Sequence, residues 1–241
     1  EGAETLAEAG EWRAWERRAD EALGVDSASR AFEATLAAAA LLAERGEPTL
    51  LFAPSRAAVR FWAGALARMT AAPGGEHSLS PAARAARRLA RREPCADHAL
   101  LAELLAAGVA CHHGDLSAAG RRLAEQAFAD GSVRLLATTT TLAHGMNLTA
   151  ANVVQWPRVF RSTAEGNGAY APREAPLERW RWRQQAGRAA RLGQGEGPGR
   201  ALVVAEDEDQ VRRFWRHYLE GEPEPLRAPL RGGTVGLGAL A

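Results

Sequence analysis

The sequence predicts a doubly wound α/β fold, in which a parallel sheet carries helices on both faces. Short apolar runs alternate along the chain with longer stretches whose apolar residues recur at a helical period. One such run, residues 49–53, lies between Pro48 and Pro54 and has the pattern of a strand buried on both faces of a parallel sheet. Strands and helices that alternate at this spacing are joined by right-handed crossovers.

Breakers and capping residues indicate the bounds of the elements. Gly46 and Pro48 end one helix, and Ser55 can cap the next. The expected helices are residues 1–24, 31–45, 56–69, 81–92, 97–107, 117–129, about 176–191 and 208–219. The expected strands are residues 49–53, 109–111, 133–138, 152–155 and 200–205. A loop that contains Gly166 and Gly168 is expected before the helix that begins near residue 176.

The length favours one domain with appendages, because 241 residues can bury one good core. We expect an N-terminal helical segment over residues 1–28 and the α/β domain over residues 29–220. Prolines and glycines gather in residues 221–241, which we interpret as a linker toward a missing domain.

The composition is that of an ordinary globular protein, with 46% hydrophobic and 24% charged residues. Apolar stretches such as residues 37–43 fall short of the roughly 20 residues that cross a bilayer. The acidic start at Glu1–Glu4 does not resemble a secretory signal, so we expect a cytoplasmic protein with no membrane partner. Cys95 and Cys111 are too few for a disulfide scaffold and are expected to be reduced. The net charge of +1 does not decide for or against nucleic acid.

The most specific pattern is the segment 184–191, Gln-Gln-Ala-Gly-Arg-Ala-Ala-Arg, late in an expected helix. On a helix Arg188 and Arg191 project on one face, from which they can reach a phosphate chain. Guanidinium groups are permanently charged planar forks, suited to stabilising the charge that builds up during phosphoryl transfer. Taken alone, the pair could equally be a solvated face of an arginine-rich protein, in which every basic residue is arginine.

A second pattern is the segment 137–148, Ala-Thr-Thr-Thr-Thr-Leu-Ala-His-Gly-Met-Asn-Leu, which begins at the end of an expected strand. Strand ends are where α/β sheets bind ligands. Several hydroxyls and backbone amides form a cradle for a phosphodiester, and Gly145 allows close approach of a backbone. Helix capping explains any one of the threonines but not the whole string.

Two further patterns also follow expected strands. Ser55 and Arg56 open a helix whose N-terminus can receive a backbone phosphate. Cys111, His112 and His113 stand in a row, but adjacent side chains on a strand point to opposite faces, which disfavours zinc. His113 could form hydrogen bonds within the domain or to a nucleic-acid strand.

Taken in order, these patterns resemble the motifs of superfamily 2 helicases of the Ski-like branch, over roughly residues 46–230. The segment 184–191 is similar to motif VI, with Ala190 in place of the usual glycine, and the segment 137–148 is similar to motif V. Ser55-Arg56 resembles motif IV. His113 and Arg121 fit a block with His-His-Ala-Gly-Leu, in which Gly114-Asp115 replace Ala-Gly here, and Thr149 stands where proline is common.

The resemblance implies the second RecA-like motor domain of a DExH/DEAD-box helicase, in which Arg188 and Arg191 are arginine fingers. The residues implied to face the nucleotide are Gln184, Gly187, Gly145 and Asn147, and those implied to contact nucleic acid are Ser55, Arg56, His113, Thr139, Thr140 and Thr141. ATP and Mg²⁺ would be held mainly by a first RecA-like domain, in cis or in trans. The other partner would be DNA or RNA, single-stranded or duplex.

The chain has no GxxxxGK[ST] phosphate loop, and none is possible because it has no lysine. It also lacks a DExH or DEAD box, so we expect no appreciable ATP hydrolysis by this chain alone. The first motor domain could have been cut away, be a separate polypeptide, or have been lost.

Two other functions remain open. One is a non-catalytic nucleic-acid-binding or regulatory scaffold derived from a helicase, which the spacing of the segment 184–191 disfavours. The other is a simple RNA-binding domain that uses the basic helix 81–92 and ignores ATP, with a steep salt dependence of binding. The arginines of that helix are Arg84, Arg87, Arg88, Arg91 and Arg92.

Overall fold

The computed structural model describes residues 9–23, 30–70, 80–140, 148–164, 170–189, 199–222 and 224–225. A five-stranded sheet forms the centre, in the order β2-β3-β1-β4-β7, and every neighbouring pair is parallel. Its strands are β1 (Thr49–Phe52), β2 (Val109–His112), β3 (Leu135–Thr138), β4 (Asn152–Gln155) and β7 (Arg200–Leu202). The expected RecA-like α/β fold is confirmed, and each of these strands overlaps the range expected for it.

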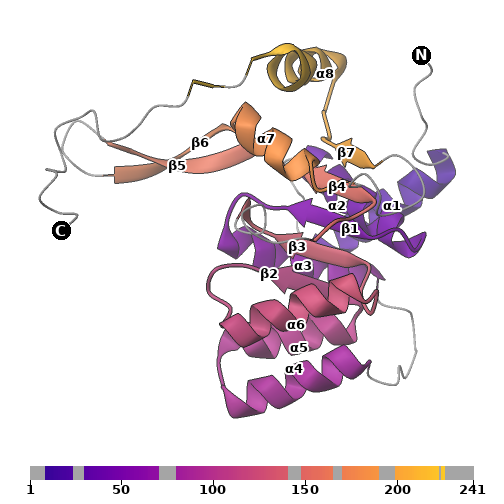
Figure 1. The fold of residues 1–241 in the computed structure, drawn as a ribbon. Coiled ribbons are helices and arrows are strands. Elements are labelled where there is room, and N and C mark those ends of the chain that lie inside the picture. The colour runs from indigo at the N-terminus through magenta and orange to yellow at the C-terminus, as the bar shows by residue number, and fades with distance from the viewer. Residues whose placement is uncertain are drawn as a thin grey trace, which may run out of the picture.

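Helices cover both faces of the sheet (Figure 1). They are α1 (Ala9–Leu23), α2 (Arg30–Glu44), α3 (Arg56–Thr70), α4 (Pro81–Arg92), α5 (Ala96–Ala106), α6 (Ala118–Ala129), α7 (Arg179–Ala186) and α8 (Glu208–Phe214). The chain crosses from β1 outward to β2 and returns through α6 to β3, so right-handed crossovers place α3 and α6 on opposite faces. Among the described residues, no helix has the length and apolarity needed to span a membrane.

The core forms around β1, in which all four residues are buried. Leu51 pairs with Ala137 of β3 on one side and with Val154 of β4 on the other, and none of these three residues is exposed. Apolar residues of α2 and α3, including Leu42 and Leu66, belong to the same cluster. The strand is therefore held by backbone pairing at its sides and by packing on its faces.

Serine residues begin three of the helices, as capping chemistry requires. The Ser55 Oγ accepts a hydrogen bond from the Ala58 amide at 3.1 Å, which confirms the expected cap of α3. Ser80 and Ser117 bond in the same way to the third residue that follows each of them. These caps matter for the site, because α3 and α6 both begin just beyond the ends of strands.

A β-hairpin stands where the sequence predicts only a loop. Strands β5 (Arg158–Ala164) and β6 (Tyr170–Pro176) pair antiparallel and extend away from the central sheet (Figure 1). The loop prediction was wrong for most of this segment. Pro172 and Pro176 lie inside β6, and proline cannot donate to a ladder, so the pattern did not indicate a strand. A two-stranded sheet tolerates these prolines, because each of its strands has one edge that forms no ladder hydrogen bonds.

The ends of the chain are described only in part. The helix expected over residues 1–24 is confirmed as α1, and residues 1–8 lie outside the described part. The helix expected over residues 208–219 is α8 followed by a π-helix, η2 (Trp215–Glu220). Most of the linker expected over residues 221–241 lies outside the described residues.

We predict that Leu51→Ala lowers the free energy of unfolding by about 2–5 kcal/mol, because it leaves a cavity in the central strand. Leu219→Ala is the control, since Leu219 is 47% exposed, and it should cost about 1 kcal/mol or less. Urea denaturation of both variants measures the difference. Equal losses would show that β1 is not the centre of the core.

Candidate nucleic-acid and nucleotide interface

The carboxyl ends of β1, β2, β3 and β4 meet at one edge of the sheet, which we call the carboxyl edge. The last residues of the four strands, Phe52, His112, Thr138 and Gln155, lie in register. The segments that follow these strands therefore begin side by side. Of the residues implied to contact nucleic acid, the structure brings Ser55, Arg56, His113, Thr139 and Thr140 to this edge, and Thr141 lies outside the described residues.

Arg56 occupies the first turn of α3, where a phosphate is expected, but its guanidinium already has a partner. Its side chain is 60% exposed and bonds to Asp115, in the turn between β2 and α6. A phosphate at the N-terminus of α3 would thus have to compete with the Asp115 carboxylate for Arg56.

Arg60, one turn further along α3, joins two carboxylates. Its Nε donates to the Asp97 Oδ1 at 2.6 Å, and one terminal nitrogen donates to the Asp115 Oδ2, also at 2.6 Å. These hydrogen bonds hold the pKa of Asp97 and of Asp115 below the ordinary aspartate value and raise the pKa of Arg60. We call Arg56, Arg60, Asp97 and Asp115 the Arg60 network.

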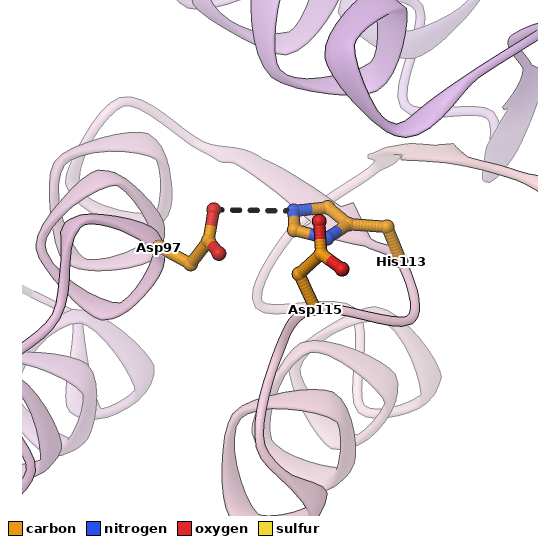
Figure 2. A group of neighbouring side chains, drawn as sticks. All are labelled: Asp97, His113 and Asp115. Atoms are coloured by element: carbon orange, nitrogen blue, oxygen red, sulfur yellow. Dashed lines mark ion pairs between the residues drawn. The ribbon is translucent and has the colours of Figure 1, made fainter.

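His113 lies beneath the Arg60 network. Figure 2 shows its ring beside Asp97 and Asp115, and its Nε2 is 3.7 Å from the Asp97 Oδ1. The ring is fully buried, and neither ring nitrogen has a hydrogen-bond partner in the described part of the chain. Burial lowers the pKa of His113, so the ring is neutral at pH 7. A fully buried ring cannot touch a nucleic-acid strand in this conformation, so the implied contact of His113 stays a prediction that requires the ring to be uncovered.

The three residues considered for zinc point to different surroundings. The His112 Nε2 lies 2.7 Å from the Glu125 Oε1, whereas His113 faces Asp97. Burial raises the pKa of the Cys111 thiol to about 12, so its thiolate is scarce at pH 7. These side chains do not form one ligand set.

A different group has ligand spacing. One ligand atom each from Asp97, His113 and Asp115 lie within 4.8 Å of one another. Arg60 already binds both carboxylates, so a cation would have to displace a guanidinium of the same charge sign. The arrangement is that of an ion-pair network.

The threonine segment, of which the structure describes Thr138 to Thr140, is buried at its start and becomes more exposed along the chain. The Thr138 Oγ1 donates to the His112 carbonyl at 3.1 Å, and the Thr139 amide donates to the same carbonyl at 3.3 Å. Thr139 is 7% exposed and Thr140 is half-buried. Of the two, Thr140 is the better placed to meet a ligand, and Gly145 and Asn147 lie outside the described residues.

The arginine segment does not continue as a helix. Helix α7 ends at Ala186 and Gly187 caps it, so Arg188 lies in a turn beyond the helix. The expectation that Arg188 and Arg191 share one helical face was wrong for Arg188, and Arg191 lies outside the described residues. Gly187 keeps a right-handed conformation, with φ of −64°, so it is not a left-handed glycine stop. The chain leaves the helix where Ala189 pairs with Ala150.

The turn at Arg188 is fastened to the chain just before β4. The Ala150 amide donates to the Arg188 carbonyl at 3.0 Å, and Ala150 forms a parallel bridge with Ala189. Gln184 is exposed and Gly187 is the capping residue, whereas Arg188 is only 7% exposed. The Arg188 turn therefore lies near the amino end of β4, away from the carboxyl edge.

The sequence analysis did not single out Arg60 and Asp97. Arg60 follows Arg56 by four residues on α3, which places both side chains on one face of the helix. Asp97 lies in the first turn of α5, where acidic residues are favoured in any helix. The four-residue spacing of Arg56 and Arg60 was a usable signal in the sequence. The position of Asp97 at the start of a helix gave no indication that it would pair with Arg60.

Comparison with known proteins supports a superfamily 2 helicase C-terminal domain. Residues 89–193 match the family described as the helicase conserved C-terminal domain. The chain is 35% identical over 137 residues to the ATP-dependent DNA helicase Hel308 of Aeropyrum pernix, a segment that covers 55% of this chain and 17% of that protein. It is 28% identical over 190 residues to the protein of the same name from Methanocella arvoryzae, which covers 78% of this chain and 24% of that protein. The matched part is thus less than a quarter of either relative.

We predict that Asp97→Asn lowers the free energy of unfolding at pH 7 by about 1–2 kcal/mol, because it removes charge-assisted hydrogen bonds to Arg60. Since the folded pKa of Asp97 is depressed, its stabilisation is present above the ordinary aspartate pKa of about 3.9 and is lost as the pH falls through the folded value. Urea denaturation from pH 7 to acid should show the two proteins converging. Glu174→Gln is the control, since its ion pair with Arg158 is exposed and worth less. A difference that does not change with pH would contradict the assignment to the charge of Asp97.

Proposed function

We propose that this chain is the second motor domain of an ATP-dependent nucleic-acid helicase of the Ski-like branch. In this proposal the carboxyl edge grips one strand of DNA or RNA, and Arg188 and Arg191 face ATP held by a first RecA-like domain. The observation that supports it best is the meeting of Ser55, Arg56, Thr139 and Thr140 at one edge of a parallel sheet. Ten residues after Thr140, the Ala150 amide donates a hydrogen bond to the Arg188 carbonyl.

The strand grip follows from the chemistry of the carboxyl edge. A phosphodiester needs donors that can approach closely, and the N-terminus of α3 offers backbone amides together with the Arg56 side chain. Thr140 adds a hydroxyl two residues beyond the end of β3. Contacts of this kind bind the backbone and do not read bases, which suits a domain that must move along any sequence.

Bound ATP would supply the phosphoryl group whose transfer powers movement. This chain would supply positive charge, from arginine side chains, near that group. Arg188 and Arg191 would neutralise the negative charge that develops on the transferred group. Because Arg188 is 7% exposed, the turn after Gly187 must shift for its guanidinium to reach a neighbouring domain. The grip on nucleic acid would then change as the two domains close and reopen.

The burial of Arg188 is also the observation that favours a second candidate, a non-catalytic nucleic-acid-binding or regulatory scaffold. In a scaffold the arginine would serve only to hold the turn against the start of β4. The two functions differ in whether Arg188 affects ATP hydrolysis.

We predict that Arg188→Ala lowers nucleic-acid-stimulated ATP hydrolysis about 10³-fold or more in the polypeptide that carries both motor domains. Steady-state ATPase assays with and without single-stranded DNA or RNA measure the effect, and the chain alone should be inactive. Arg212→Ala is the control, because Arg212 is an exposed arginine whose ion pairs, with Glu208 and Asp209, stay within α8. Unchanged ATPase activity in Arg188→Ala would favour the scaffold.

A separate prediction concerns the competition for Arg56. Asp115→Asn removes a negative charge that holds both Arg56 and Arg60, so it should tighten binding of single-stranded DNA by roughly fivefold near 0.1 M salt. Fluorescence anisotropy measures the affinity. Glu11→Gln, which releases Arg45 in the same way, should leave binding unchanged. Weaker binding by Asp115→Asn would show that Asp115 positions Arg56 and does not compete for it.

A further inference from the structure

Helix α4 presents a basic face that the proposed function does not use. Its twelve residues, Pro-Ala-Ala-Arg-Ala-Ala-Arg-Arg-Leu-Ala-Arg-Arg, include five arginines and no acidic residue. The buried face consists of Ala82, Ala83, Ala86 and Leu89. All five arginines, Arg84, Arg87, Arg88, Arg91 and Arg92, are exposed, and together we call them the α4 arginine face.

The charge of this face is largely uncompensated within the part of the chain that the structure describes. Arg92 pairs with Glu93 at 3.0 Å, but that pair is exposed and weak. Arg87, Arg88 and Arg91 enter no ion pair with another described residue. In α1, by contrast, arginines such as Arg13 and Arg17 alternate with glutamates. The α4 arginine face therefore carries a concentrated positive field.

Keeping these arginines together has a cost for the isolated helix. Like charges four residues apart, such as Arg87 and Arg91, destabilise a helix by about 0.2–0.5 kcal/mol for each pair. The whole chain has no lysine, so it is expected that the basic residues of this helix are arginine, but this does not explain why no acidic residue interrupts them. A polyanion on this face would offset the repulsion.

The position of α4 connects this face to the carboxyl edge. Residues 93–95 join α4 to α5, and α5 begins at Ala96, beside the Arg60 network. His98 fixes this corner, since its Nδ1 lies 2.7 Å from the Glu93 carbonyl and its Nε2 lies 2.9 Å from the Ser117 Oγ. The C-terminal end of α4 thus lies at the same end of the sheet as Arg56 and Thr140. From there α4 runs back alongside α5, on the side of α5 and α6 that faces away from the sheet (Figure 1).

We propose that the α4 arginine face binds the phosphate backbone of the nucleic acid gripped at the carboxyl edge, and so lengthens its binding path. A helix of this length extends the path by about 18 Å, which corresponds to several nucleotides of a single strand. The partner is a nucleic acid because the face continues an edge that already offers phosphate-binding groups, and because arginines without a base-reading groove bind phosphates of any sequence. The inference rests on the proposed function in one respect, that the strand passes the carboxyl edge.

The test is the double substitution Arg87→Ala/Arg91→Ala in the whole chain. Binding of labelled single-stranded DNA of about 6 and about 20 nucleotides is measured by fluorescence anisotropy over a range of salt concentrations. For the longer strand we expect a loss of about fivefold or more near 0.1 M salt, and a salt slope smaller by about 1.4. The shorter strand, which fits at the carboxyl edge, should bind as it does to the unaltered chain.

Two variants control for charge and for folding. Arg13→Ala/Arg17→Ala removes two exposed arginines at the same spacing from α1 and should leave both affinities unchanged. Arg87→Lys/Arg91→Lys keeps the charge and should retain the salt slope. The alanine variant should not lose thermal stability, because alanine favours helix and the substitution removes a like-charge pair.

The outcomes separate this inference from the proposed function. If Arg87→Ala/Arg91→Ala binds the longer strand as tightly as Arg13→Ala/Arg17→Ala does, the α4 arginine face is not part of the path. If it loses affinity equally for both lengths, the face is the primary site and the extension proposed here is wrong. The proposed grip is tested by Arg56→Ala, which should weaken binding of both lengths. If Arg56→Ala has no effect while the α4 variant weakens only the longer strand, the α4 site stands and the proposed grip fails.

Discussion

The arrangement of the candidate site depends on β1, because a strand buried on both faces must have its backbone groups paired on both sides. All four residues of β1 are buried, and β3 and β4 flank it in the same direction. Parallel pairing forces each connection to return to the opposite end of the sheet before the next strand begins. For this reason Ser55, His113 and Thr139, which are far apart in the chain, become neighbours. A substitution that loosened β1 would therefore displace the segments of the carboxyl edge together.

The Arg60 network converts this proximity into a defined geometry. Arg60 bonds to residues 37 and 55 positions away, so it ties α3 to α5 and to the turn before α6. The Arg60 side chain is 34% exposed and that of Asp97 is 17% exposed, so the ions keep part of their hydration and the desolvation cost is moderate. Because His113 is neutral beneath them, the network is balanced in charge, with two arginines and two aspartates. Asp115, at 33% exposed, is the more exposed of the two acids, and it is the one that binds both arginines.

The sequence predicts the sheet well and the contacts of the site poorly, for physical reasons. A strand such as residues 49–53 can be recognised in the sequence because burial on both faces produces a continuous apolar run without alternating polar residues. The hairpin of β5 and β6 was missed because Pro172 and Pro176 argue against a strand, although Gly166-Asn167-Gly168 is a hairpin-turn signal in the sequence. Patterns place a side chain on an element, but the pairing of Arg60 with Asp97 depends on how two helices are packed. The exposure of Arg188 depends on where α7 ends, and the pairing of Ala189 with Ala150 just beyond that end is a tertiary contact that no local pattern indicates.

The positions of Thr140 and Ala150 bear on how a nucleotide could affect the grip on nucleic acid. The chain leaves the carboxyl edge at Thr140, and it is next described from Leu148, before Ala150 binds the turn that carries Arg188. Coupling between two sites requires an element whose arrangement both of them bias. A shift of the Arg188 turn would pull on Ala150 through a backbone hydrogen bond, at the entry to β4. Strand β4 pairs along its length with β1, which ends shortly before Ser55 and Arg56, so the sheet is the described element that joins the Arg188 turn to the carboxyl edge.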